Sequence, residues 1–329
     1  MISGNVGIVV ISRNEALRLP ACLSSLGTPV RLVYVDSGST DDSVAIAERC
    51  GAIIVQLDPD IPFTAARARN EGFAALKAAE SNIQYVQFLD GDCELDEAWL
   101  HEAASFLAAR RDVAVVCGRR RERYPNETIF NKLCDVEWDT PIGEAISSGG
   151  DFLIRADAFE AVGGFLPALM AGEEPEMCAR LRERGFKIWR IDAEMTTHDV
   201  SLKGFGQWWR RMVRSGYGYA EVSDILRTSS CRIYQREVWR AIFWAGILPI
   251  SILVSSFFYP LMLWSVLIYP LQILRISCRV QKRNINRYAY ALFMMIAKFA
   301  ELQGILKFKF SSFSGRTVRP IEYKGYLLK

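Results

Sequence analysis

Short apolar runs alternate along the first part of the chain with longer segments whose apolar residues recur at helical spacing. The runs are rich in Val and Ile and end at polar or glycine-containing turns, as strands do. The predicted strands are residues 7–11, 31–35, 52–57, 83–90 and 113–118. The predicted helices between them are residues 15–26, 40–50, 62–80 and 97–111. This alternation predicts an α/β fold with a mostly parallel sheet flanked by helices.

Ligands of such sheets bind at the carboxyl ends of the strands. The polar residues Ser12, Asn14, Asp36 and Asp90 all fall at predicted strand ends. The first strand is not followed by G-x-G-x-x-G, and the chain has no G-x-x-x-x-G-K-[ST]. The pattern therefore argues against an NAD-dependent enzyme and against a P-loop NTPase.

The segment "FLDGDCEL" places Asp90, Asp92 and Glu94 directly after an apolar strand. Asp90 and Asp92 offer hard oxygen ligands, and Gly91 permits a tight turn between them, so a divalent cation would offset their repulsion. The alternative is a helix cap or a solvated turn. We expect Glu94 to cap the following helix.

Hydropathy changes near residue 240, because residues 241–274 contain no charged residue. One helix of this length would span about 51 Å, against a hydrocarbon core of roughly 30 Å, and three prolines would interrupt it. Both flanks are basic, which favours the cytoplasm for both ends. We expect a hairpin, either two short spans or a re-entrant pair. The alternative is that these are core helices of a soluble domain.

Residues 288–306 are apolar but include Lys298 and Glu301. They predict an amphipathic interfacial helix, with a third span as the alternative. The expected domains are therefore a catalytic domain over residues 1–235 and a membrane-associated helical region over residues 236–329.

Overall charge adds little, since the formal net charge is only +3 and Lys and Arg occur in local clusters. A nucleic-acid partner is not expected. The eight cysteines are scattered singly, which favours reduced thiols over a disulfide framework or a zinc knuckle. The first apolar run is too short for a signal peptide, so the catalytic body is expected in the cytoplasm.

Six segments together resemble family 2 glycosyltransferases of the GT-A fold, of the membrane-associated bacterial type. They cover residues 7 to 190 in the family's order: "VVISRNEALRLPACLSSL", "VYVDSGSTDDS", "AARARNEGF", "FLDGDCEL", "SGGDFLIRADAFEAVGGF" and "GEEPEMCARLRERGFKI". The resemblance implies a UDP- or GDP-sugar donor and transfer of its sugar to an acceptor hydroxyl.

The resemblance also implies roles for individual residues. It places Asp36 at the nucleotide base, Asp90 near the ribose, and Asp92 on Mg²⁺ or Mn²⁺ at the diphosphate. Arg69 is expected to approach the nucleotide, although an exposed helix arginine is the plain alternative. Nucleotide contacts are further expected from the first loop, at Ser12, Asn14 and Glu15.

Glu173 and Glu174 stand at the start of a predicted helix. They are either ordinary N-terminal acids that favour the helix dipole or the site of the general base for the acceptor hydroxyl. The resemblance favours Glu174 as the base, with Glu173 as the second candidate. The family usually has Asp where this chain has Glu174. We expect the helix dipole to keep the Glu174 carboxylate ionised.

Of the two histidines, His101 is expected to be a surface or core-edge residue. His198 follows a strand-like segment in the region where several metal-dependent GT-A enzymes place a third metal ligand. The resemblance therefore adds His198 to Asp92 and Asp90 as a candidate ligand, with a structural histidine as the alternative.

The segment 205–221 is both aromatic and basic, which favours a helix at the membrane interface. It also resembles, imperfectly, the Q-x-x-R-W segment of processive synthases, so processivity is not supported. Trp208 and Arg210 are candidate contacts to the acceptor or the diphosphate. The "GGD" turn adds Gly150 and Asp151 to these candidates.

The sequence thus predicts an inverting, metal-dependent glycosyltransferase at the inner membrane, acting on a lipid-linked glycan or a polysaccharide. Two alternatives are a non-catalytic membrane scaffold with a transferase fold and a D-x-D phosphatase with Asp90 as nucleophile. The phosphatase family would require Thr or Val shortly after the second Asp, where this chain has Cys93 and Glu94.

Overall fold

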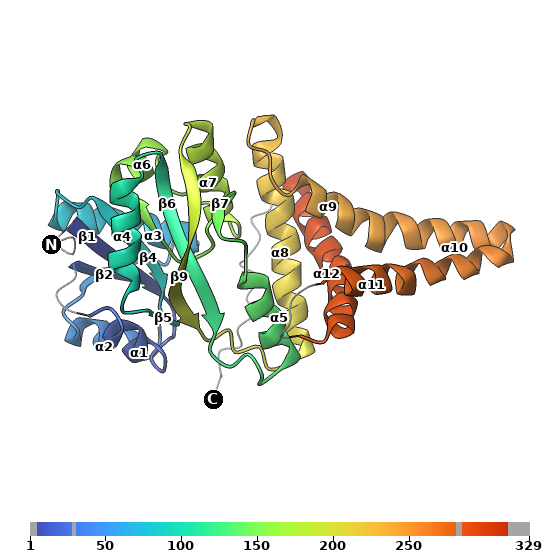
Figure 1. Ribbon diagram of the computed structural model, residues 1–329, viewed down its shortest axis with the longest axis horizontal. Coiled ribbons are helices and arrows are strands. Elements are labelled where there is room, and N and C mark those ends of the chain that lie inside the picture. The colour runs from blue at the N-terminus through green and yellow to red at the C-terminus, as the bar shows by residue number, and fades with distance from the viewer. Residues whose placement is uncertain (1–4, 28–30, 281–284, 315–329) are drawn as a thin grey trace. The chain divides into compact units, whose positions relative to one another are not determined.

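The computed structural model of the protein describes residues 5–27, 31–280 and 285–314 (Figure 1). The chain forms two compact units. The sheet unit consists of Met1–Tyr124, Glu137–Val200 and Ser229–Cys231. The helical unit consists of Pro125–Val136, Ser201–Thr228 and Arg232–Lys329.

The sheet unit contains the strands that the sequence predicts and four more. Its strands are β1 (Val6–Ser12), β2 (Arg31–Asp36), β3 (Ile53–Gln56), β4 (Tyr85–Asp90), β5 (Cys93–Leu95), β6 (Val113–Glu122), β7 (Gly143–Ala145), β8 (Phe152–Arg155) and β9 (Lys187–His198). Its helices are α1 (Leu19–Ser24), α2 (Ser43–Arg49), α3 (Ala65–Ala79), α4 (Trp99–Ala109), α6 (Ala156–Ala161) and α7 (Glu173–Glu183).

The strands form one sheet in the order β3-β2-β1-β4-β8-β6-β9-β5, with β7 paired to β9. Strands β3, β2, β1 and β4 are parallel, and β6 is parallel to β9. Strand β8 runs antiparallel to its neighbours β4 and β6, and β5 and β7 run antiparallel to β9. The predicted α/β sheet flanked by helices is confirmed, with antiparallel pairs added in its second half.

The burial of β1 fits its place inside the sheet. Every residue of β1 except Ser12 is buried, as expected of a parallel strand covered on both faces. Helix α3 packs on β1 and β2, while α4 packs on β6, β8 and β9. Thr64 caps α3 by accepting a hydrogen bond from the Arg67 backbone N–H. Helix α2 begins at Ser43, three residues after the start of the helix predicted over residues 40–50.

The helical unit contains helices only, within its described residues. They are α8 (Phe205–Ile225), η2 (Leu226–Thr228), α9 (Gln235–Ile242), η3 (Phe243–Ile247), α10 (Leu248–Phe258), η4 (Pro260–Leu267), α11 (Ile268–Arg279) and α12 (Arg287–Ser314). Helix α5 (Ile129–Trp138) begins in this unit, and its last two residues belong to the sheet unit.

Helices α8 and α12 lie side by side within the helical unit. Their closest approach is at Gly216 and Gly304. A Cβ atom at Gly216 would clash with the backbone of Glu301, and one at Gly304 would clash with the backbone of Val213 and Tyr217. Only glycine at these positions lets the two backbones come this close.

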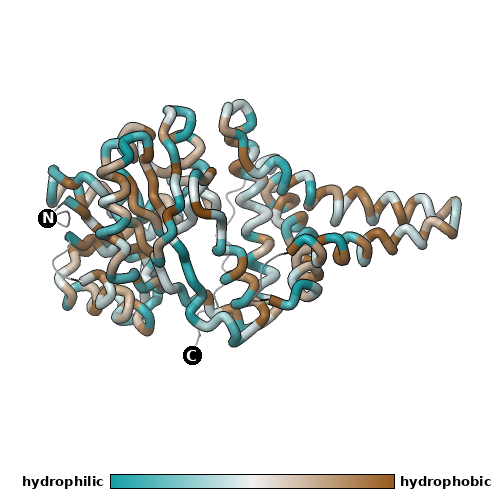
Figure 2. Tube along the Cα trace, in the orientation of Figure 1, coloured by the Kyte–Doolittle hydropathy of each residue, from teal (hydrophilic) through white to brown (hydrophobic). Residues whose placement is uncertain are grey.

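Helix α10 and the η4–α11 segment form the two arms of a hairpin that is rich in hydrophobic residues (Figure 2). Helices α10 and η4 bury none of their residues. Among the residues that the structure describes, three continuous helical stretches are long and apolar enough to cross a membrane: Gln235–Phe258, Pro260–Arg279 and Arg287–Ser314. An exposed apolar hairpin does not support the alternative of core helices in a soluble domain.

Candidate active site

The carboxyl ends of β1, β2 and β4 meet at one edge of the sheet. In the strand register Ser12 pairs with Asp36, and Ile11 pairs with Asp90. Between β1 and β4 the strand order reverses, since β2 and β3 lie on one side and β8 on the other. Such a reversal is where open α/β sheets form their ligand crevice.

Asp36 and Asn14 fix the loops at this edge. The Asp36 Oδ2 atom accepts hydrogen bonds from the backbone N–H groups of Gly38 (2.9 Å) and Ser39 (2.8 Å). Asn14 has a positive φ of 55°, and its Oδ1 atom accepts a hydrogen bond of 2.7 Å from the Thr40 backbone N–H. The loops after β1 and β2 are therefore tied together, which positions both predicted nucleotide contacts.

The other two residues of the first loop have partners inside the sheet unit. The hydroxyls of Ser12 and Tyr34 lie 2.7 Å apart. Glu15 is buried and accepts a hydrogen bond of 2.6 Å from Arg18, while its backbone N–H donates to Ser43 at 3.0 Å. A ligand that contacts Ser12 or Glu15 would meet side chains that are already held in position.

Arg69 links the D-x-D turn to the start of α7. Its guanidinium donates to Asp90 at 2.8 Å and to Glu173 at 2.7 Å. The Arg69 side chain is almost fully buried, so the alternative of an exposed helix arginine is wrong. Two carboxylates from different segments are thus held by one cation, which makes Asp90 and Glu173 parts of a single cluster.

Asp151 binds a second arginine, Arg120, next to the D-x-D turn. The Asp151 side chain is fully buried and accepts hydrogen bonds from Arg120, from Thr196 at 3.0 Å, and from the Asp90 backbone N–H at 3.2 Å. Burial alone would raise the pKa of Asp151, but the positive charge of Arg120 holds it below its ordinary value. The burial of Asp151 argues against direct contact with an acceptor.

Gly150 lies where a side chain could not be accommodated easily. A Cβ atom there would come within 3.2 Å of the Arg120 guanidinium and 3.3 Å of the Asp90 carboxylate. Its carbonyl also lies 3.4 Å from the Arg69 guanidinium. The "GGD" turn therefore keeps the space between the two arginines open.

Asp92 and His198 face each other although 106 residues separate them. The pairing of β5 with β9 places Cys93 opposite His198, and the His198 Nε2 atom lies 3.1 Å from the Asp92 carboxylate. His198 is 5% exposed, and burial, with the positive charge of Arg120, lowers its pKa to about 4. The imidazole is therefore neutral at pH 7 and keeps a lone pair for a metal.

The donor set fits a divalent cation. Two ligand atoms bound to one ion at about 2.1 Å and at right angles lie roughly 3.0 Å apart, close to the separation of Asp92 and His198. The Nδ1 atom of His198 is buried and has no hydrogen-bond partner among the described residues. Carboxylate oxygens suit Mn²⁺ and Mg²⁺, and a neutral imidazole is a common ligand of divalent metals.

Glu174 is buried at the first turn of α7. Its Oε1 atom accepts hydrogen bonds from the Ser148 backbone N–H (2.6 Å), the Ser148 hydroxyl (2.7 Å) and the Cys178 thiol (2.9 Å). Burial raises the pKa of Glu174, and the hydrogen bonds offset only part of this effect. Desolvation therefore acts against the expected effect of the helix dipole, and the expectation that Glu174 stays ionised remains a prediction.

Trp208 and Arg210 lie on α8, in the helical unit. Trp208 is 1% exposed and packs against Phe130, Phe205 and Phe293, so its side chain belongs to the interior of that unit. Burial argues against a direct contact of Trp208 with an acceptor. Arg210 is exposed, and its contact to the acceptor or the diphosphate stays a prediction.

Two smaller expectations can be assessed directly. Glu94 does not cap α4, because it lies in β5 and forms an ion pair with Arg123. The residue before α4 is Ala98, which has no side-chain cap. His101 lies exposed on α4, as expected.

Sequence reasoning missed three residues that shape the site: Arg120, Ser148 and Cys93. Arg120 was visible only as part of a basic cluster, and its pairing with Asp151 depends on β6, β8 and β9 lying together. Ser148 is the first residue of the segment "SGGDFLIRADAFEAVGGF", but no role was assigned to it from the sequence. Cys93 directly follows the D-x-D, which was the one available signal.

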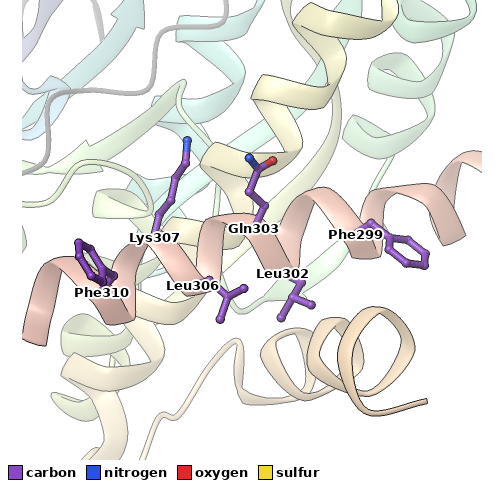
Figure 3. Close-up of a pocket in the computed structure, with 6 residues that line it drawn as sticks. All are labelled: Phe299, Leu302, Gln303, Leu306, Lys307 and Phe310. Carbon is purple, nitrogen blue, oxygen red and sulfur yellow. The ribbon is translucent and has the colours of Figure 1, made fainter. Parts of the chain in front are cut away.

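The helical unit also has a pocket of about 420 Å³, formed on α12 (Figure 3). Its lining residues are Phe299, Leu302, Gln303, Leu306, Lys307 and Phe310. Leu302 and Leu306 point away from Gln303 and Lys307. With neither carboxylate nor imidazole in its lining, this pocket does not offer the acid–base or metal chemistry of the sheet edge.

Comparison with known families identifies the class of protein. Residues 85–278 match the model of glycosyl transferase family group 2, and residues 7–161 match that of glycosyl transferase family 2. The chain therefore belongs to the family 2 glycosyltransferases and is a transferase enzyme. This membership does not support the scaffold and phosphatase alternatives.

Individual relatives agree with this assignment. The glycosyltransferase AglE of Haloferax volcanii is 25% identical over 262 residues, which cover 74% of this chain and 81% of AglE. The O-antigen chain rhamnosyltransferase WbaN of Salmonella anatum is 30% identical over 174 residues, covering 49% of this chain and 53% of WbaN.

Solved structures confirm the GT-A fold. The mannosyltransferase PcManGT from Pyrobaculum calidifontis, in complex with GDP-Man and Mn²⁺, has a TM-score of 0.66 at 16% identity. That alignment covers 92% of this chain and 87% of PcManGT. S. aureus TarS 1-349 in complex with UDP-GlcNAc has a TM-score of 0.51 at 14% identity and covers 95% and 92% of the two chains.

Proposed function

We propose that this glycosyltransferase moves a sugar from a UDP- or GDP-sugar to a hydroxyl of a lipid-linked glycan or polysaccharide, with inversion at the anomeric carbon. The observation that carries the proposal is the pairing of Asp92 with neutral, buried His198. This arrangement lies at the sheet edge where open α/β sheets bind ligands.

The nucleotide half of the donor is assigned to the loops after β1 and β2. Asp36 would contact the base, and Ser12, Asn14 and Glu15 would line the first loop. Asp90 would lie near the ribose, held by Arg69. Arg69 already binds two carboxylates, so its positive charge serves the cluster as a whole.

Asp92 and His198 would hold Mn²⁺ or Mg²⁺, with Asp90 as a further ligand. A bound cation supplies positive charge where the departing nucleoside diphosphate becomes more negative. The proposal is supported by the Mn²⁺ present with GDP-Man in the structure of PcManGT.

Glu174 is the proposed general base for the acceptor hydroxyl, and Glu173 is the second candidate. A carboxylate with a raised pKa is a better proton acceptor than an ordinary one, which favours buried Glu174. Glu173 is neutralised by Arg69. One direct displacement inverts the anomeric centre, because no enzyme nucleophile takes part. Gly150 and Arg210 remain candidates for contacts to the acceptor or the diphosphate.

The helical region over residues 236–329 is proposed to anchor the enzyme in the inner membrane, with the catalytic region 1–235 in the cytoplasm. The exposed apolar hairpin and its basic flanks support this orientation. Residues 201–228 pack with the C-terminal helices, so the functional boundary at residue 235 stays a prediction. Whether α12 spans the bilayer or lies at its surface also stays a prediction.

The test is Asp92→Asn in the full chain, with Glu94→Gln as the matched control. We expect Asp92→Asn to lower transfer about 10²-fold or more and to abolish Mn²⁺-dependent thermal stabilisation by the donor. Glu94→Gln alters an ion pair with Arg123. It should retain both transfer and the Mn²⁺-dependent thermal stabilisation by the donor.

The donor is to be found by thermal shift with a panel of UDP- and GDP-sugars, with and without Mn²⁺. A flat response to every donor would refute the proposal. Unchanged turnover in Asp92→Asn would refute the metal role alone.

A further inference from the structure

The Cys93 thiol lies between two groups of metal-binding side chains. Its sulfur, a carboxylate oxygen of Asp92 and a ring nitrogen of His198 all lie within 4.8 Å of one another. The same sulfur also lies within 4.8 Å of a carboxylate oxygen of Asp90 and one of Asp151. Cys93 is thus the residue that both groups share.

The position of Cys93 is fixed by its strand. It is the first residue of β5, its side chain is fully buried, and it pairs with His198 across β9. The Cys93 Sγ atom lies 3.7 Å from the Asp92 Oδ1 atom, toward which the thiol donates. The opposite oxygen of Asp92 faces the His198 imidazole at 3.1 Å. Sulfur, oxygen and nitrogen therefore converge from two paired strands.

We propose that Cys93, Asp92 and His198 form a binding site for a thiophilic divalent cation, with Zn²⁺ as the natural ion. Zinc takes thiolate, imidazole and carboxylate ligands together, whereas Mg²⁺ and Mn²⁺ favour oxygen. On binding, the sulfur–metal bond forms as the thiol releases its proton to solvent, and no group changes oxidation state.

One consequence rests on the proposed function. Zinc would use the same Asp92 and His198 that we assign to Mn²⁺ or Mg²⁺. A tightly bound zinc ion would therefore compete with the activating cation and inhibit transfer. The thiol makes this competition stronger, since divalent sites generally bind Zn²⁺ more tightly than Mn²⁺ and sulfur adds to the difference.

The plain alternative is that Cys93 only fills space. It belongs to the hydrophobic core of the sheet unit, where a buried thiol behaves as a small apolar group. In that case metal would bind through Asp92 and His198 without any bond to sulfur. The two cases differ in whether a metal–thiolate bond forms, which spectroscopy detects directly.

The experiment uses Cd²⁺ as the probe and the full chain in detergent, with the cysteines that are not buried replaced: Cys50→Ser, Cys231→Ser and Cys278→Ser. We expect a cadmium–thiolate absorption band that saturates at one Cd²⁺ per chain. Adding Cys93→Ser should remove the band. Adding His198→Ala should weaken Cd²⁺ binding about 10-fold or more. Cys117→Ser, at a buried thiol on β6, should leave the band unchanged.

The proposal is overturned if Cys93→Ser keeps the band or if the background protein shows none. Cys93→Ala and circular dichroism check that the variant is folded. Cadmium NMR of the background protein reports sulfur ligation without any change at Cys93. A missing band alongside normal Mn²⁺-dependent transfer would sink only this inference, whereas a normal band without transfer would sink only the proposed function.

Discussion

The two units of this molecule treat burial in opposite ways. The sheet unit buries charged groups, such as Asp151 and Arg69, and satisfies them with partners of opposite charge. The helical unit leaves large apolar groups exposed, such as Leu253 at 69% and Phe257 at 85%. Neither arrangement suits a protein that only has to be stable in water. The buried charges of the sheet unit favour a charged ligand there. The exposed apolar groups of the helical unit favour hydrocarbon as its surroundings.

The cost of the buried charges supports this interpretation. Buried ion pairs often stabilise a fold less than well-packed apolar groups of the same size would. The cluster of Arg69, Asp90 and Glu173 is thus better explained by ligand binding than by stability. The same holds for Arg120 and Asp151, which lie directly beneath the D-x-D turn.

The largest expected effect concerns the sheet unit. Glu174→Gln should lower the transfer rate by about 10²- to 10⁴-fold, because the proposed general base is lost while the side chain keeps its size. Glu173→Gln is the comparison, since it removes a partner of Arg69 but not the proposed base. The measurement is kcat with a saturating donor. A larger loss in Glu173→Gln would reverse the assignment.

The pH dependence of Glu174 provides a second readout of the same prediction. Because burial raises its pKa, transfer should fall on the acid side at a higher pH than an ordinary carboxylate would give. The folded state binds this proton more tightly than the unfolded state does. The contribution to stability is therefore present below the ordinary value near 4.5 and is lost as pH rises through the raised pKa. Glu174→Gln should accordingly gain stability relative to the wild type at pH 8 compared with pH 4.

The next prediction compares one substitution in the helical unit with one in the sheet unit. Leu253→Arg should disfavour membrane insertion by about 2.5 to 3.5 kcal/mol if the hairpin lies in hydrocarbon. Leu17→Arg, at a leucine that is 92% exposed in the sheet unit, should change stability by less than about 0.5 kcal/mol. Alkaline extraction of membranes measures the insertion of Leu253→Arg. Thermal unfolding measures the stability of Leu17→Arg. Equal tolerance at both positions would remove the case for a membrane hairpin.

A smaller effect is expected where α8 meets α12. Gly304→Ala should destabilise the helical unit by about 1 to 3 kcal/mol, because the new methyl group would meet the α8 backbone. Gly206→Ala is the control, since a Cβ atom there has no neighbour within 4 Å. Alanine is also the better helix former, so the control should be neutral or slightly more stable. Thermal unfolding in detergent compares the two variants, and similar melting points would contradict the close approach.

The smallest effect concerns Ser148, which holds Glu174. Ser148→Ala should lower kcat about 10-fold, equivalent to about 1.4 kcal/mol, since one hydrogen bond to the carboxylate is lost while that from the backbone remains. The hydrogen bond from the Ser148 hydroxyl lowers the pKa of Glu174, so its loss should raise this pKa and move the acid limb of the pH profile to higher pH. Ser148→Thr should restore activity in part. Ser147→Ala is the neighbouring control, and a pH profile that does not move would mean that Ser148 has only a structural role.

Much of the fold follows from local patterns in the sequence. The first four strands and their helices are short and regular, so periodicity finds them to within a few residues. Because these strands were expected to be parallel, the polar residues at their ends, Ser12, Asp36 and Asp90, could be placed at one edge of the sheet. The exposed hairpin was predictable because residues 241–274 carry no charge.

The rest of the site depends on pairings that local patterns do not encode. Asp151 meets Arg120 only because β8 lies between β4 and β6. The raised pKa of Glu174 could not be predicted from a helix start, since it depends on how deeply α7 packs. His198 was suggested by family resemblance rather than by spacing.

The antiparallel pairing of β5 with β9 also has a consequence for the order of events during synthesis. A nascent chain that has emerged only as far as β8 already contains both aspartates of the D-x-D turn but lacks the imidazole that faces Asp92. The proposed cation site is therefore completed only after β9 has left the ribosome and joined the sheet. Helix α8 follows β9, and the first long apolar stretch begins only at Gln235. The order of the sequence therefore completes the set of candidate ligands before the apolar hairpin is made.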